Sequence, residues 1–277
     1  MIAAPDLLVV GGLSIDRFPD GTTAPGGSVL HAARAVAAAG GRVATIALAG
    51  AEPDAQEAIT ELARFGPSGV HHAAATIRFA IDERGSRRSL TLEVAGGTLL
   101  VEADEIERVR ASAVLLAPIA AEIDVEGVRA AGRTRVRVAA LQGWLRRLVP
   151  GEVVAPLTLA TIRPDLASAL AGFDLLVASS DDLLAEATSP EAQLDALRRR
   201  FGAGPTLIVT DGARGAHFDQ PGVDRVRIPG HPVAGSTVGA GDAFAGLVAM
   251  ELGRGVDPPT AATQAAALVA ELIAGSA

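Results

Sequence analysis

The sequence carries near its C-terminus the stretch Ser236-Thr237-Val238-Gly239-Ala240-Gly241-Asp242-Ala243-Phe244. Two glycines flank an alanine, a carboxylate follows at once, and an apolar run extends from Ala243 to Leu252. Glycine adopts backbone angles that are closed to other residues, so this turn can direct several N–H groups at one point. The apolar run predicts a helix over Asp242–Leu252, and the dipole of a helix favours an anion at its start. The stretch therefore predicts an anion site at a helix N-terminus.

Asp242 is placed to act on a hydroxyl group. A carboxylate at this point can take a proton from an alcohol while the amides of Gly239, Ala240 and Gly241 hold the charge of a migrating phosphoryl group. Gly-rich turns before helices are common, however, and an Asp in a first helical turn is often only a cap or a dipole partner. The choice between the two interpretations depends on the rest of the chain.

Short apolar runs alternate with helical segments, which predicts a doubly wound α/β fold: a mostly parallel sheet with helices on both faces. The predicted strands are Leu7–Gly11, Val43–Leu48, Ala113–Ala117, Val136–Leu141, Leu175–Ala178 and Thr206–Thr210. The predicted helices are Ser28–Ala39, Pro53–Phe65, Asp165–Ala171, Pro190–Phe201, Asp242–Leu252 and Pro259–Ala274. With 277 residues and no linker that would divide it, the chain is expected to form a single domain over residues 1–277.

One segment departs from this alternation. Thr76–Ile81 and Ser89–Glu93 alternate in polarity around Glu83-Arg84-Gly85-Ser86, which predicts a β-hairpin. A hairpin that projects from a doubly wound core can serve as a lid. We expect a small β lid from about residues 13–26 and 74–98, and a plain edge hairpin fits the pattern equally well.

The composition excludes several classes of function. A formal net charge of −8 argues against nucleic acid or an anionic membrane as the main partner. The chain has no Cys, so disulfides, thiolate nucleophiles and Cys-based metal sites are excluded, and it has no Lys, which excludes a P-loop lysine. No segment reads as a signal peptide or a membrane span, so a soluble, cytoplasmic protein is expected.

Two further segments form a common pattern with the stretch Ser236–Phe244. Near the N-terminus, Val10-Gly11-Gly12 leads to Asp16, and Pro25-Gly26-Gly27 opens a helix. Later, Leu207–Ala216 has a strand, a Thr-x-Gly turn and a second strand. In this order and spacing, ending with Gly239–Asp242, the chain resembles the ribokinase-like (PfkB-type) carbohydrate kinases from about residue 6 to residue 273.

The middle of the chain resembles one branch of that family. Ala117–Ile123 and Leu141–Arg146 are similar to the Gly-Glu-Ile and Gln-Gly-Phe-Leu-Arg stretches of the branch that includes myo-inositol kinases. Members of this branch do not all share one substrate.

The resemblance implies a doubly wound core with a small β lid, ATP and Mg²⁺ bound beside a polyol, and transfer of the γ-phosphoryl group to a hydroxyl. It assigns Asp242 as the catalytic base and Gly239, Ala240 and Gly241 as the anion hole. Polyol or sugar binding is assigned to Asp16, Gly26, Gly27, His31 and Gln142. Nucleotide binding is assigned to Thr210, Gly212, Gly215 and Thr237, and metal binding to Asp182.

The sequence also departs from the family pattern. Ser236-Thr237-Val238 stands where Asp-Thr-Thr is usual, in a loop that binds a monovalent cation in many members, so a monovalent-cation requirement stays open. His31 replaces an Asn, and Ala140 replaces an Asp ahead of Gln142. The Asn-x-x-Glu stretch that helps to order Mg²⁺ aligns with Ser180-Asp181-Asp182-Leu183.

The leading hypothesis is an ATP-dependent kinase of a small polyol or sugar, with a cyclitol such as myo-inositol favoured. A nucleoside kinase is the alternative within the same scaffold, although a low aromatic content of 3% argues against base stacking. A catalytically weak, ligand-binding relative is the alternative from another class. A nicotinamide oxidoreductase is disfavoured because the Gly-x-Gly-x-x-Gly fingerprint is missing. We expect a monomer or a loose homodimer.

Overall fold

The computed structural model describes residues 4–82 and 89–275, and within them a nine-stranded sheet forms the centre of the molecule. Its order is β15-β14-β13-β12-β9-β8-β1-β4-β5. The pairs from β13 to β5 are parallel, and β14 and β15 are antiparallel additions at one edge. The strands are β1 (Leu7–Gly12), β4 (Val43–Ala49), β5 (Ser68–His72), β8 (Ala113–Ala117), β9 (Val136–Ala140), β12 (Leu175–Ser179), β13 (Thr206–Thr210), β14 (Gly215–Asp219) and β15 (Val226–Pro229).

The central strands are buried on both faces. All six residues of β1 are buried, with Leu7 and Val9 in one hydrophobic cluster and Leu8 and Val10 in the other. Successive side chains of a strand point to opposite faces, so a strand covered on both sides needs apolar residues at every position. This requirement explains why the predicted strands read as continuous apolar runs, and all six occur with ends within one residue of the prediction.

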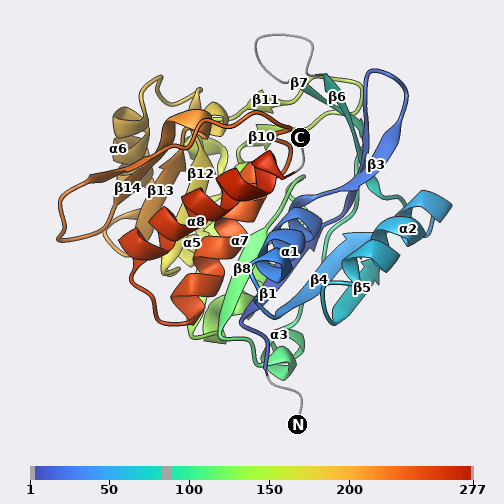
Figure 1. Ribbon diagram of the computed structural model, residues 1–277, viewed down its shortest axis with the longest axis horizontal. Helices are drawn as coiled ribbons and strands as arrows, with labels where there is room; N and C mark the ends of the chain where they lie inside the picture. The colour runs from blue at the N-terminus through green and yellow to red at the C-terminus, as the bar shows by residue number, and fades with distance from the viewer. Residues whose placement is uncertain (1–3, 83–88, 276–277) are drawn as a thin grey trace.

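Helices cover both faces of the sheet. The first cluster includes residues of α1 (Ser28–Ala38), α2 (Pro53–Leu62), α7 (Ala240–Gly253) and α8 (Pro258–Ala274). The second includes residues of α3 (Ala103–Val109), α4 (Val125–Ala130), α5 (Pro164–Leu170) and α6 (Pro190–Phe201). Figure 1 shows α1, α7 and α8 side by side in front of the sheet. The doubly wound α/β architecture is thus confirmed.

Helix α7 is buried along most of its length, from Ala243 to Met250. A helix that is apolar all round belongs in the interior, and α7 packs against both α1 and α8. It begins at Ala240, two residues before the predicted start, because Gly239 is the last residue with left-handed backbone angles and Ala240 is already helical.

A second sheet of four strands has the order β3-β2-β6-β7. Its strands are β2 (Ser14–Arg17), β3 (Thr23–Gly26), β6 (Ile77–Asp82) and β7 (Ser89–Val94), all within the two segments predicted to form a lid. β6 and β7 are the antiparallel strands of the predicted hairpin, whose turn residues Glu83–Ser86 lie outside the described residues. β2 starts two residues after β1 ends, so this small sheet extends from the carboxyl end of β1.

Two acidic residues at the start of α2 hold the small sheet against the core. Glu52 accepts hydrogen bonds from the N–H of Thr76 at 3.0 Å and from its hydroxyl at 2.9 Å. Asp54 forms an ion pair of 2.8 Å with Arg78 of β6. These contacts lower the pKa of both carboxyl groups, chiefly through the Thr76 N–H for Glu52 and through the Arg78 hydrogen bond for Asp54.

No helix in the part of the chain that the structure describes is both long enough and apolar enough to span a lipid bilayer.

Candidate active site

Three elements bring Asp242, Gln142 and Ser28 together at the carboxyl edge of the main sheet. Asp242 lies in the first turn of α7, Ser28 opens α1, and Gln142 opens a short 3₁₀ turn (Gln142–Trp144) that follows β9. The Nε2 group of Gln142 donates to Asp242 Oδ1 at 2.7 Å and to Ser28 Oγ at 2.6 Å. The carboxylate of Asp242 is therefore held in a defined orientation.

Asp242 faces a cavity, named here the Asp242 cavity, which the small sheet partly covers. The predicted polyol-binding residues Asp16, Gly27, His31 and Gln142 line it together with Asp242 and Gly239. Phe79, Ile81 and Leu90 of the small sheet also line it, as do Ile119 and Arg146. Sequence reasoning placed most of these polar residues in one site, and the structure brings them together.

A second cavity, the Thr210 cavity, lies on the other side of the turn that precedes α7. All four residues predicted to bind a nucleotide line it: Thr210, Gly212, Gly215 and Thr237. Much of the remaining wall is apolar and includes Val233, Phe244, Val269 and Ile273.

The Gly239–Asp242 turn separates the two cavities. Gly239 and Asp242 line the Asp242 cavity, whereas Ala240 and Gly241 line the Thr210 cavity. The first i→i−4 bond that closes α7 runs from the N–H of Ala243 to Gly239 O at 2.8 Å. The N–H groups of Gly241 and Asp242 precede that bond and have no partner within the helix, so they can bind an anion at the helix start.

Gly239 has left-handed backbone angles, with φ of 75°. A Cβ atom at this position would lie 2.2 Å from Cγ and 2.3 Å from Nδ1 of His31. The imidazole ring thus lies directly against the turn, and only glycine fits there.

Asp16 lies within β2 of the small sheet and not at the end of a strand of the main sheet. Its carboxylate is 7% exposed and accepts a hydrogen bond from Ser14 Oγ at 2.8 Å. A Cβ atom on Gly26 would lie 2.2 Å from Asp16 Oδ2, so the backbone of Gly26 packs directly against that carboxylate. Gly27 has φ of 99°, and a Cβ atom there would lie 2.4 Å from the carbonyl oxygen of Gly12.

Arg146 is the cation of the Asp242 cavity. Its Nε donates to Asp182 Oδ1 at 2.8 Å, and the two side chains are only 15% and 9% exposed. Burial works against the charge of Arg146, but the carboxylates of Asp182, Asp242 and Asp181 outweigh it and raise the pKa of the guanidinium. Asp182, the residue predicted to bind the metal, is thus paired with Arg146 in this structure. The neighbouring Asp181 is exposed.

Glu122 ties the loop after β8 to the end of β1. Its Oε1 accepts from the N–H of Gly12 at 2.7 Å and of Ile119 at 3.0 Å, and its Oε2 accepts from the N–H of Ala120 at 2.7 Å. Burial raises the pKa of this carboxyl group. The N–H donors lower the pKa, but the effect of burial is larger. The loop that it holds includes Ile119, which lines the Asp242 cavity.

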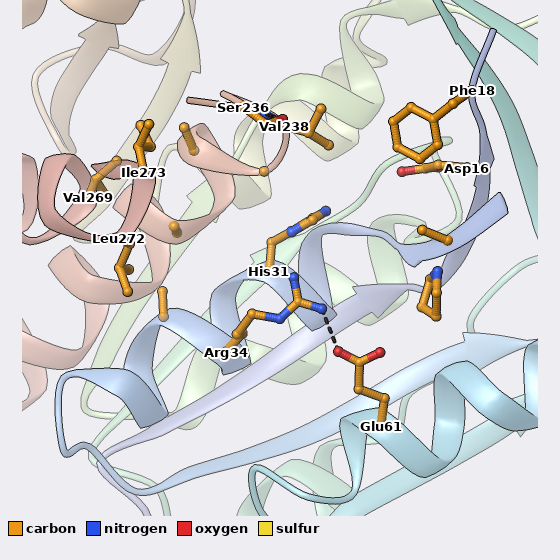
Figure 2. Close-up of a pocket in the computed structure, with 16 residues that line it drawn as sticks. Asp16, Phe18, His31, Arg34, Glu61, Ser236, Val238, Val269, Leu272 and Ile273 are labelled. Carbon is orange, nitrogen blue, oxygen red and sulfur yellow. Dashed lines mark hydrogen bonds and ion pairs between the residues drawn. The ribbon is translucent and has the colours of Figure 1, made fainter. Parts of the chain in front are cut away.

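A further cavity, the His31 cavity of about 450 Å³, continues from the Asp242 cavity and shares Asp16, His31, Val238 and Gly239 with it. Figure 2 shows Phe18 and Asp16 on one side of it and Val269, Leu272 and Ile273 of α8 on the other. An ion pair between Arg34 and Glu61, of 2.5 Å, lies at its edge.

Two serines of the site lie outside the sequence predictions. Ser28 and Ser14 both line the Asp242 cavity and are almost fully buried. Ser28 follows Gly27 and Ser14 lies two residues before Asp16, and this closeness to predicted site residues is what could have pointed to them. Their own residue type carried no signal, because serine is common at helix starts and strand ends.

Within residues 4–82 and 89–275, no group of three or more His, Cys, Asp or Glu side chains is arranged to hold a metal ion.

Comparison with known proteins gives a family and a fold. Residues 145–276 match the model of the pfkB family carbohydrate kinases. No curated protein sequence matches the chain.

Several solved structures are similar over nearly the whole chain. A pyrophosphate-dependent kinase in the ribokinase family, complexed with a pyrophosphate analogue and myo-inositol, has a TM-score of 0.76 at 16% identity and covers 96% of this chain and 94% of its own. Arabidopsis thaliana ribokinase, complexed with ribose and ATP, has a TM-score of 0.73 at 19% identity, with coverages of 98% and 93%. Ribokinase from Cryptococcus neoformans var. grubii serotype A, in complex with ADP, has a TM-score of 0.72 at 22% identity, with coverages of 98% and 94%.

The glycine-rich turn that lies between the two cavities falls within the residues that match the family model. Residues 145–276 match the pfkB family carbohydrate kinase model, and the chain as a whole has a ribokinase-like fold.

Proposed function

We propose that the protein transfers the γ-phosphoryl group of ATP to a hydroxyl group of a small polyol or sugar, with a cyclitol such as myo-inositol as the favoured acceptor. The observation that carries this proposal is the position of the Gly239–Asp242 turn, which has a polar, carboxylate-bearing cavity on one side and an apolar cavity on the other. A phosphoryl group passing between donor and acceptor would cross this helix start.

In the proposed reaction, the acceptor binds in the Asp242 cavity and gives its hydroxyl proton to Asp242 as its oxygen attacks the γ-phosphorus. The bond from the γ-phosphorus to the bridging oxygen breaks, and ADP leaves with that oxygen. The N–H groups of Gly241 and Asp242 stabilise the charge on the phosphoryl oxygens. One well-placed donor of this kind contributes roughly 3–4 kcal/mol to catalysis, against about 1 kcal/mol for an ordinary helix cap.

The Thr210 cavity supports a nucleotide as the donor. Its apolar wall, which includes Val233, Phe244 and Val269, suits a flat base, whereas pyrophosphate has no apolar part to bury. Thr210 and Gly212 would contact the nucleotide, and Gly215 and Thr237 would line the same binding site. ATP brings Mg²⁺ with its phosphates, and Asp182 and the exposed Asp181, whose charges both act on Arg146, are the carboxylates that would contact the metal.

The Asp242 cavity supports a polyol as the acceptor. Two carboxylates, Asp16 and Asp242, line it, and a carboxylate accepts paired hydrogen bonds from vicinal hydroxyls. Phe79 and Leu90 would cover the apolar face of a ring when the small sheet acts as a lid. The similar structures that were solved with myo-inositol or ribose bound agree with this class of acceptor. We expect the chain to act as a monomer or loose homodimer without nucleic acid.

A nucleoside is the second candidate acceptor, and the His31 cavity favours it. This cavity of about 450 Å³ continues from the Asp242 cavity and has apolar walls, so a base attached to a bound sugar has room there. A base in this cavity would have Arg34 and Glu61 as polar partners (Figure 2).

A coupled ADP-release assay over cyclitols, sugars and nucleosides tests the proposal. We expect turnover with ATP and at least one polyol. Turnover that is faster with nucleosides would favour the second candidate, and turnover with pyrophosphate alone would overturn ATP as the donor. ATP binding without turnover on any acceptor would favour a ligand-binding relative.

The Asp242→Asn variant tests the role of the base. It should lower kcat by about 10²–10⁴-fold while ATP binding is kept, the usual range for loss of a general base. Asp257→Asn is the matched control, because Asp257 also lies at a helix start and accepts a capping bond from Thr260 at 3.2 Å, but it lines neither cavity. Undiminished turnover by Asp242→Asn would refute the role of Asp242.

A further inference from the structure

Gln142 lies in the Asp242 cavity, yet its amide nitrogen is directed at the protein and not at the space where an acceptor would bind. Nε2 donates to Asp242 Oδ1 at 2.7 Å and to Ser28 Oγ at 2.6 Å, so both of its hydrogens are used. An ionised carboxylate only accepts hydrogen bonds, so the nitrogen, and not the oxygen, of the amide must face Asp242.

The backbone under Gln142 is fixed by its surroundings. A Cβ atom on Gly143 would lie 2.5 Å from the carbonyl oxygen of Pro118, so the 3₁₀ turn is pressed against the loop after β8. Trp144 Nε1 donates to Ile123 O at 2.8 Å, and the N–H of Leu145 donates to Gln142 O at 3.1 Å. A side chain on such a support can hold its partner in one orientation.

From this geometry we infer that Gln142 is a positioning residue, which holds Oδ1 of Asp242 so that Oδ2 is directed at the acceptor hydroxyl. The inference rests on the proposed kinase function and deepens it. It replaces direct substrate binding as the main role of Gln142, and it assigns Ser28 as the second anchor of the same amide. Because Ser28 Oγ accepts from Gln142, its own proton stays available to a group in the cavity.

The two roles predict different kinetics. A positioning residue acts on the chemical step, so Gln142→Met should lower kcat by about 10- to 100-fold, the range expected for a small misplacement of a reacting group. The KM for the acceptor should change by less than about threefold. A residue that binds the acceptor directly would instead raise KM and leave kcat largely intact.

Gln142→Glu gives a pH signature that a purely structural role would not produce. Two carboxyl groups at hydrogen-bond distance share one proton, and that proton lets the introduced group donate to Asp242 as the amide does. At higher pH both groups ionise and repel each other, so the donor is lost. The charged or titratable groups that line the same cavity are Asp16, His31 and Arg146, and Asp181 and Asp182 lie behind Arg146.

The experiment measures kcat and KM against pH for the wild type, Gln142→Met and Gln142→Glu, with thermal unfolding of each protein. We expect a descending limb of kcat for Gln142→Glu at pH values where the wild-type profile is flat, and a uniformly low kcat for Gln142→Met. Gln193→Met is the matched control, since Gln193 is fully buried but donates to Ser180 O and Ala187 O, away from Asp242. It should lower the unfolding temperature and leave kcat unchanged.

The outcomes separate this inference from the proposed function. A wild type without turnover on any alcohol would overturn the kinase proposal itself. An active wild type, combined with a Gln142→Glu profile of wild-type shape or a Gln142→Met variant altered only in KM, would overturn the positioning role alone. Should Gln142→Met not fold, the presence or absence of the descending limb in Gln142→Glu decides the matter.

Discussion

Replacing Gly239 by alanine tests the contact between the anion-binding turn and His31. The new Cβ atom would lie 2.2 Å from Cγ, 2.3 Å from Nδ1 and 2.7 Å from Cδ2 of the imidazole. Non-bonded carbons attract each other best at about 3.5–4.0 Å, and these ring atoms lie near the root of the side chain, so the ring or the turn has to shift. Alanine also meets the left-handed φ of 75°, which costs about 1–2 kcal/mol.

The expected effect on stability is the sum of these two terms. The backbone strain of about 1–2 kcal/mol adds to an overpacking cost of about 1–3 kcal/mol, so Gly239→Ala should lose roughly 2–5 kcal/mol of unfolding free energy. A shift of about 1 Å in the turn should also reduce kcat/KM by about 10²-fold, because the amides and Asp242 then miss the phosphoryl group. Urea unfolding and the ADP-release assay measure the two effects.

Gly40→Ala is the matched control for the backbone term. Gly40 has φ of 73°, but a Cβ atom there would meet nothing within 4 Å, so only the strain of about 1–2 kcal/mol is expected. The double variant His31→Ala/Gly239→Ala should recover most of the overpacking cost and keep the strain. If Gly239→Ala loses no more stability than Gly40→Ala and keeps kcat/KM within about twofold, the reasoning about the turn is wrong.

Three further predictions follow from buried or paired charges. Glu122→Gln should lose about 1–3 kcal/mol in urea unfolding, because either orientation of the amide places an NH₂ group against a backbone N–H donor; wild-type stability would refute this. Asp182→Asn leaves the charge of Arg146 without its partner and should cost about 3–5 kcal/mol, while an unchanged unfolding midpoint would show that water already screens the pair. Since Arg78 lowers the pKa of Asp54 from 3.8, this pair stabilises the fold above that pH and its contribution is lost as the pH falls through the lower, folded-state value. The unfolding midpoint of Asp54→Asn should therefore depend less on pH below about 4 than that of the wild type, and parallel curves would contradict the assignment.

The central part of the fold could be predicted from sequence because it depends on a local rule. A parallel strand that is buried on both faces needs apolar residues along its length. The sequences of β1, β8 and β13 follow this pattern. Edge strands follow no such rule: β5 reads Ser-Gly-Val-His-His and is half exposed, so its sequence gives no strand signal. The short helices α3 and α4 were missed, whereas α5, which at seven residues is as long as α3, begins with Pro164, where proline marks a helix start.

The candidate site was predictable to a similar extent. The Gly-Ala-Gly-Asp turn predicts a helix start by itself, because backbone angles and the helix dipole are local properties, but the choice of an anion site over a plain cap depended on the rest of the chain. The partner of Asp182 was not predictable, since Arg146 lies 36 residues away, in the short strand β10 (Arg146–Arg147), whereas Asp182 lies in a 3₁₀ turn after β12. The assignment of Gln142 to substrate binding rested on its position in a motif, which says nothing about the direction of an amide.

By itself the sequence determined the central buried strands, the longer helices and the glycine-rich turn at residues 239–242, because hydrophobic periodicity and glycine geometry act over a few residues. The tertiary structure decided which side chains meet at Asp242. Gln142 lies 100 residues from Asp242 and 114 residues from Ser28 in the chain, yet its amide nitrogen is within hydrogen-bond distance of both side chains. Parallel strands bring their carboxyl ends to one edge of the sheet, and only the order of the strands sets which loops become neighbours there.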